Sequence, residues 1–156
     1  MDITINYTEI YSVVERSLSV IGKRSTDENG NRLFTDITLG TREKEIAYDY
    51  FRSAIVALAA DLRQYVTVET FSATSFTVRI SLYEDHNEHL EPTITQAIKD
   101  YIVAYALFSW FVITAPRLQE KYMLESERYR TYIIYQVFHH QRPSSLPNPL
   151  RQKSET

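Results

Sequence analysis

The chain has 156 residues, of which 44% are hydrophobic and 24% charged, the composition of one ordinary globular domain with its own core. Its formal net charge of −3 lacks the basic excess typical of general nucleic-acid-binding proteins. Cysteine is absent, which excludes disulfides and thiolate metal ligands. The first residues also lack the basic and apolar regions of a signal peptide.

Helical spacing of apolar residues predicts a first helix over about Tyr7–Ile21. Asn6 occupies the N-cap position, and Glu9 follows three residues later as the partner of a capping box. Gly22 indicates the end of the helix. The predicted buried face consists of Tyr7, Ile10, Tyr11, Val14, Leu18 and Ile21.

A long connector over residues 25–40 precedes a second predicted helix, Arg42–Tyr65, with Thr41 as its N-cap. The connector contains strong turn chemistry in Asp27–Asn31, and a loop of this length is usually functional or lies against a neighbour. The helix presents a continuous apolar stripe of Ala47, Tyr50, Phe51, Ala54, Ile55, Leu58, Leu62 and Tyr65.

A β-hairpin is expected next, over about residues 66–83. Apolar and polar residues alternate from Phe76 to Tyr83, and Val66–Thr70 forms a weaker partner strand. Ser72–Ser75 is the expected turn, although it contains no glycine. Because a lone two-stranded hairpin is marginal in water, it must pack on the helices or pair with strands of another subunit.

The third helix is expected to begin near Pro92 and to end near Thr114. It contains the almost unbroken apolar run Tyr101–Ile113. This run has about 13 residues, whereas a membrane span needs roughly 20, and charged residues flank it. The run therefore predicts the buried central helix of the domain.

The fourth helix is expected from Pro116 to about His139, and prolines prevent helix beyond Arg142. We therefore divide the chain into a helical domain, 1–141, and an extended C-terminal arm, 142–156. The fourth helix is charged and unusually rich in tyrosine, with more large aromatic side chains than one small core needs. The predicted subunit or partner interface comprises Tyr122, Tyr129, Tyr132, Tyr135, Phe138, Arg142, Leu146, Leu150 and Arg151.

The residues that suit catalysis or metal binding form no complete motif. His86, Glu88 and His89 have side chains that suit a divalent ion, but their spacing fits equally a solvated linker. His139 and His140 suit the C-terminal end of a helix dipole. We expect no enzyme activity, no cofactor and no bound metal. The basic arm leaves nucleic-acid binding open as an alternative, as the histidines do for metal binding.

The element order resembles that of the head–tail connector (adaptor) proteins of tailed bacteriophages. Two helices, a β-hairpin, a very apolar helix, a charged helix and an extended arm cover most of 7–156. The resemblance rests on this order, on size and on composition, and it transfers no individual functional residue.

The resemblance implies a structural virion protein that forms an oligomeric ring at the phage neck and joins the portal to the tail. Its partners would be other copies, the portal protein, and tail or neck proteins, without a membrane. DNA would pass through the lumen without specific binding, and assembly would occur in the host cytoplasm. Another neck or tail-completion subunit is an alternative with the same features.

Overall fold

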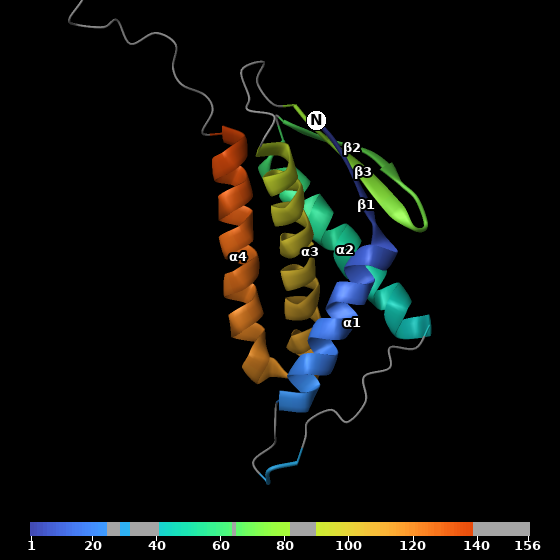
Figure 1. Ribbon diagram of the computed structural model, residues 1–156, viewed down its shortest axis with the longest axis vertical. Coiled ribbons are helices and arrows are strands. Elements are labelled where there is room, and N and C mark those ends of the chain that lie inside the picture. Colours follow the sequence, from blue (N-terminus) through green and yellow to red (C-terminus); the bar gives the residue numbers. More distant parts are fainter. Residues whose placement is uncertain (25–28, 32–40, 64, 82–89, 139–156) are drawn as a thin grey trace, which may run out of the picture.

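The computed structural model describes residues 1–24, 29–31, 41–63, 65–81 and 90–138, which form four helices and a three-stranded antiparallel sheet (Figure 1). The predicted mainly α fold, with a β-hairpin between the second and third helices, is confirmed. The predicted arm, 142–156, lies outside the described residues. The elements are β1 Asp2–Asn6, α1 Tyr7–Arg24, α2 Thr41–Asp61, β2 Val66–Phe71, β3 Ser75–Ile80, α3 Glu91–Thr114 and α4 Pro116–Phe138.

α3 is the central helix, because α1, α2 and α4 all pack against it (Figure 1). Its length and hydropathy would also suit a membrane span, but it lies inside the bundle as the sequence predicts for a core helix. Pro92 lies in its first turn, as expected. Its buried residues are Ile94, Ala97, Ile98, Tyr101, Ile102, Ala104, Ala106, Leu107 and Phe111.

A sharp break separates α3 from α4. Ala115 leaves the helical region, with φ −153° and ψ 74°, while its N–H still bonds the Phe111 carbonyl. Pro116 has no N–H to continue the ladder of α3, but its ring suits the first position of a new helix. The chain therefore reverses, and α4 runs back along α3.

The sheet has the strand order β1-β3-β2, so the hairpin gains a third strand from its own chain. β1, which was not predicted from the sequence, places Ile3 opposite Val78 and Ile5 opposite Phe76. Beside these pairs, the N-terminal ammonium of Met1 donates to the Ile80 carbonyl at 2.8 Å. The hairpin is thus paired within the chain and needs no strand from another subunit to complete a sheet.

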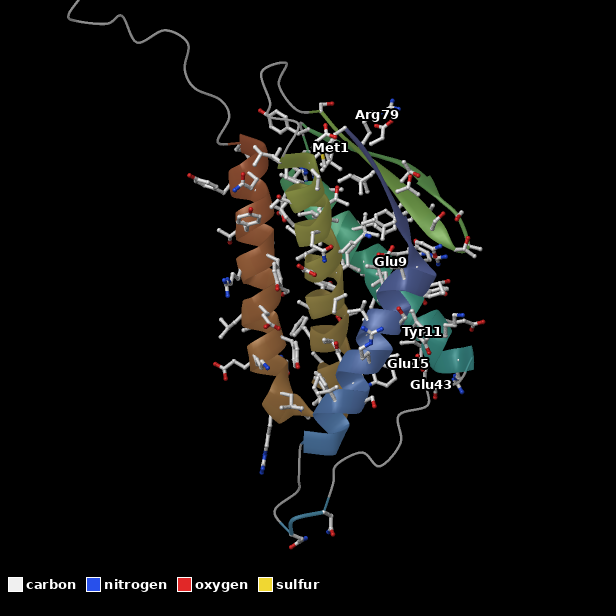
Figure 2. The ribbon with its side chains drawn as sticks, in the orientation of Figure 1. Met1, Glu9, Tyr11, Glu15, Glu43 and Arg79 are labelled. Carbon is white, nitrogen blue, oxygen red and sulfur yellow. The ribbon has the colours of Figure 1, made fainter. Side chains whose placement is uncertain are left out.

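An ion pair on the exposed face reinforces the β1–β3 pairing. Arg79 donates from Nε to Asp2 Oδ1 at 2.8 Å and from Nη2 to Oδ2 at 3.1 Å. Figure 2 shows Arg79 beside Met1 at one end of the sheet. The hydrogen bond from Arg79 lowers the pKa of Asp2, because it stabilises the charged carboxylate.

The hairpin turn closes without glycine because Ser72 supplies the missing bonds. Its hydroxyl accepts the N–H of Ser75 at 2.8 Å and that of Thr74 at 3.2 Å. Its own N–H donates to the Ser75 carbonyl at 2.9 Å. This is the local side-chain turn that serine favours, and it falls in the predicted segment.

The first two helices differ from the prediction at their ends. α1 continues through Gly22 to Arg24, whereas α2 ends at Asp61, four residues before the predicted Tyr65. There the N–H groups of Tyr65 and Val66 both bond the Leu62 carbonyl, at 2.7 and 3.0 Å. This tight turn keeps Leu62 buried while it directs the chain into β2.

Helix α1 begins as predicted, but only part of its capping box is used. Asn6 Oδ1 accepts the N–H of Thr8 at 2.9 Å, which confirms the N-cap. Glu9, the predicted partner of Asn6, pairs with Lys99 of α3 at 2.6 Å. The carboxylate thus joins two helices.

We expect Phe111→Ala to lower the free energy of unfolding by about 3–5 kcal/mol, because the ring is fully buried and its removal leaves a cavity. Urea unfolding followed by circular dichroism measures this change. Val112→Ala is the matched control, since Val112 is 44% exposed, and it should cost no more than about 0.5 kcal/mol. Equal losses in the two variants would contradict the central position of this part of α3.

Burial raises the pKa of Tyr101, and Tyr105 adds to this effect. The unfolded chain therefore releases this proton at a lower pH than the folded protein does. The contribution of the neutral Tyr101 phenol to the free energy of unfolding is complete below pH 10, the pKa of the unfolded chain. It is lost as the pH rises through the pKa of the folded protein. We expect the free energy of unfolding to fall above about pH 10, and less steeply in Tyr101→Phe. Urea unfolding at a series of alkaline pH values tests this, and an unchanged slope in the variant would refute it.

Candidate interaction surface

The inner face of α4 belongs to the core. The ring of Tyr122 packs on Phe111 of α3, with 5.3 Å between centroids, and Ile133 and Val137 are buried further along. Ser126, also buried on this face, donates its hydroxyl to the Met123 carbonyl at 2.8 Å. This face seals one side of α3.

A polar contact fixes α4 to the end of α2. Arg130 donates from Nε and Nη2 to the two carboxylate oxygens of Asp61, at 2.5 and 2.7 Å. Its Nη1 also donates to Glu127, at 3.0 and 3.2 Å. The hydrogen bonds to Asp61 raise the pKa of Arg130 above its ordinary value. Nearby, Phe138 packs edge-on against Tyr65, with 4.9 Å between centroids.

The outer face of α4 carries large apolar side chains into solvent. Leu124 is 60% exposed and Tyr135 52% exposed, and Met123, Tyr132 and Phe138 are exposed to a smaller extent. Leu124 lies about half a turn from the buried Tyr122 and Ser126, because each residue advances a helix by about 100°. Helix α4 lies on the side of the bundle away from the sheet (Figure 1), so its outer face borders open solvent.

The structure divides the predicted interface residues into three groups. Tyr122 is only 7% exposed and belongs to the core, which corrects its prediction as an interface residue. Tyr129 is half-buried. Burial is the main cause of its raised pKa, and the negative charge of Asp100 raises the pKa further. Tyr132, Tyr135 and Phe138 do lie on the surface. The predicted residues Arg142, Leu146, Leu150 and Arg151 lie outside the described part of the chain.

Charged residues of opposite sign lie on the two sides of the exposed ridge, which we define as the exposed apolar side chains of α4: Met123, Leu124, Tyr132, Tyr135 and Phe138. Lys121 and Arg128 lie on one flank, while Glu120 and Glu127 lie on the other, and all four are exposed. The ammonium of Lys121 also lies 5.2 Å from the centre of the Tyr122 ring. Leu124 and this charge pattern were not predicted from the sequence. The helical wheel would have shown both once the buried face was centred on Tyr122, Ser126 and Ile133.

A second cluster, where α1, α2 and β3 meet, is a packing feature. The buried ring of Tyr7 contacts Tyr48, Phe51 and Phe76, with centroids 5.0, 6.1 and 5.8 Å away. The guanidinium of Arg52 lies 5.9 Å from the Tyr7 ring centre and so covers this cluster. Burial raises the pKa of Tyr7. The arrangement favours a neutral phenol inside an aromatic cluster.

On the neighbouring helix face, Tyr11 lies among acidic residues. Figure 2 shows it with Glu15 and Glu43, and Lys44 lies 5.5 Å from its ring centre. Burial is the main cause of the raised pKa of Tyr11, and the negative charge of Glu15 raises the pKa further. The raised pKa favours a neutral phenol at this position.

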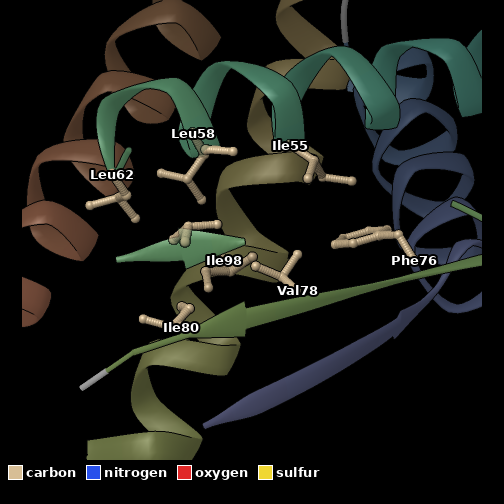
Figure 3. A pocket seen from close by; sticks show the side chains of 9 residues that line it. Ile55, Leu58, Leu62, Phe76, Val78, Ile80 and Ile98 are labelled. Carbon is tan, nitrogen blue, oxygen red and sulfur yellow. The ribbon is translucent and has the colours of Figure 1, made fainter. Parts of the chain in front are cut away.

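The cavity enclosed by α2, α3 and the sheet is too small for a ligand. Its volume is about 10 Å³, enough for one water molecule at most (Figure 3). Its walls are hydrocarbon and offer no group for orienting a substrate. They consist of Ile55, Leu58, Ala59, Leu62, Val66, Phe76, Val78, Ile80 and Ile98.

Within the described residues, no group of three or more histidine, cysteine, aspartate or glutamate side chains could hold a metal ion. The predicted metal ligands His86, Glu88 and His89 fall outside those residues. Ser109, within the apolar run, donates its hydroxyl to the Tyr105 carbonyl at 2.9 Å. Among the described residues, the outer face of α4 carries five of the twelve exposed large hydrophobic side chains.

Comparison of the chain with protein-family models, with curated proteins and with solved structures gives no significant match.

Proposed function

We propose that this chain is a structural subunit of the tailed-bacteriophage neck, where copies assemble into a ring that joins the portal to the tail. The observation that carries the assembly role is the outer face of α4. It presents Leu124, Tyr135 and Phe138 to solvent along more than three helical turns. Large apolar side chains exposed on one helix face, with charged residues among them, occur at protein–protein interfaces.

The phage neck is proposed because of the order of the elements. Two helices, a hairpin, an apolar helix and a charged helix follow one another as in the connector proteins that the sequence resembles. The net charge of −3 supports a channel that DNA crosses without being held, since each basic contact to phosphate would add affinity. Assembly would take place in the host cytoplasm, and the mature location would be the virion.

Another neck or tail-completion subunit would share these features and would differ in its position within the particle. Electron microscopy of particles that carry a labelled copy of the chain separates the two roles. Label between portal and tail supports the connector, and label elsewhere in the neck or tail supports the alternative.

We expect the purified chain to form a multi-copy species, alone or when mixed with portal protein, because its exposed ridge is buried only on assembly. Analytical ultracentrifugation and native mass spectrometry measure the mass. Leu124→Glu should weaken assembly by at least about tenfold, because it places a charge in an apolar contact.

Val56→Glu is the matched control, because Val56 is 56% exposed on α2, away from the ridge, and the variant should assemble normally. Both variants should retain the circular dichroism spectrum of the parent. A strict monomer that binds neither portal nor tail protein would rule out the proposed function.

A further inference from the structure

The connector between α1 and α2 contains a short exposed turn. It consists of Asn29, Gly30 and Asn31, and all three residues are exposed. Gly30 has a φ of 78°, in the left-handed region that residues with a side chain rarely adopt. Among the described residues, only its chain neighbours come within 4 Å of the point where a β-carbon of Gly30 would lie. Gly30 is therefore uncrowded on this side.

An asparagine directly before a glycine has a reaction of its own. The side-chain carbon Cγ of Asn29 and the backbone nitrogen of Gly30 are placed along the chain so that a bond between them closes a five-membered ring. A side chain on the second residue hinders this attack, and glycine has none. Because the turn is exposed, water and dissolved base can reach both atoms.

We propose that Asn29 is a site of spontaneous deamidation in the folded protein. A base in solution takes the N–H proton of Gly30, and the nitrogen forms a bond to Cγ of Asn29. The Nδ2 nitrogen takes a proton from water and leaves as ammonia, which produces a succinimide. Water then breaks one of the two ring bonds to the Gly30 nitrogen. Breaking the bond to Cγ gives aspartate, and breaking the bond to the main-chain carbonyl carbon gives isoaspartate.

The reaction changes the charge and the length of the connector. A carboxylate replaces a neutral amide and adds one negative charge to the formal net charge of −3. The new carboxylate follows Asp27 and Glu28 in the sequence, so three acidic residues stand in a row. In isoaspartate the main chain also runs through the side-chain carbon, which inserts one atom into the backbone. This inference does not depend on the proposed function, because it concerns the connector and not the outer face of α4.

Two other asparagines serve as internal controls. Asn31 is exposed in the same turn, but Arg32 follows it and its side chain hinders the attack. Asn6 precedes Tyr7, whose N–H donates to the Thr74 carbonyl at 2.9 Å. The nitrogen that would attack Cγ of Asn6 is therefore already engaged.

Timed incubation of the full chain at mildly alkaline pH tests the proposal. Mass spectrometry of proteolytic peptides measures the conversion of each asparagine, and a synthetic peptide of residues 25–36 gives the rate without a fold. We expect Asn29 to convert at least about tenfold faster than Asn31 or Asn6, and less than about tenfold slower than in the peptide. The rate should rise with pH, because the attacking group is the deprotonated nitrogen.

Two variants test the roles of the reacting groups. Gly30→Val should slow the conversion at least about tenfold, because a branched side chain crowds the nitrogen and disfavours a positive φ. Asn29→Gln keeps Gly30 and removes the five-membered ring, so it should abolish conversion at this position without altering the turn. Circular dichroism checks that both variants fold as the parent does.

Three results would overturn the proposal. In the folded chain, Asn29 could convert more than about tenfold slower than in the peptide. It could also convert no faster than Asn31, or at a rate that does not change with pH. None of these results bears on the assembly measurements, so the proposed function would stand or fall separately.

Discussion

The structure depends on covering α3 from all sides. A helix with an apolar run as long as Tyr101–Ile113 cannot leave one side in water without exposing several large side chains. α1, α2 and α4 each take one part of its circumference, and these contacts fix the positions of all the helices. The sheet then covers α1 and α2 through Ile3, Ile5, Phe76, Val78 and Ile80, all of which are buried.

Helix α4 has a buried face and an exposed face. Its inner face closes the core through Tyr122, Ile133 and Val137, and the bidentate contact between Arg130 and Asp61 fixes its position relative to α2. The helix is thus held in place along its buried side.

Much of this fold follows from local patterns in the sequence. Helical periodicity, Asn6, Pro92 and Pro116 locate four helices, since each signal acts within a few residues of the element that it controls. β1 was missed because five residues with two apolar positions are a weak signal, and its partners lie 69 to 77 residues away. The early end of α2 at Asp61 was missed because its turn depends on where Leu62 and Val66 must lie in the core. The exposed residues of α4 were predicted only in part, since aromatic content does not distinguish the buried Tyr122 from the exposed Tyr135.

The pairing of β1 with β3 has a consequence for the order in which the molecule forms. β1 can pair only after β3 has been made, because Ile3 lies opposite Val78 and Ile5 opposite Phe76. Until then Ile3 and Ile5 have no strand partner, and α1 lacks both the sheet and α3. Contacts between distant parts of a chain form slowly, since a long loop must close before they stabilise the fold. β1 and α1 therefore reach their final environment only after β3 and α3 have been made.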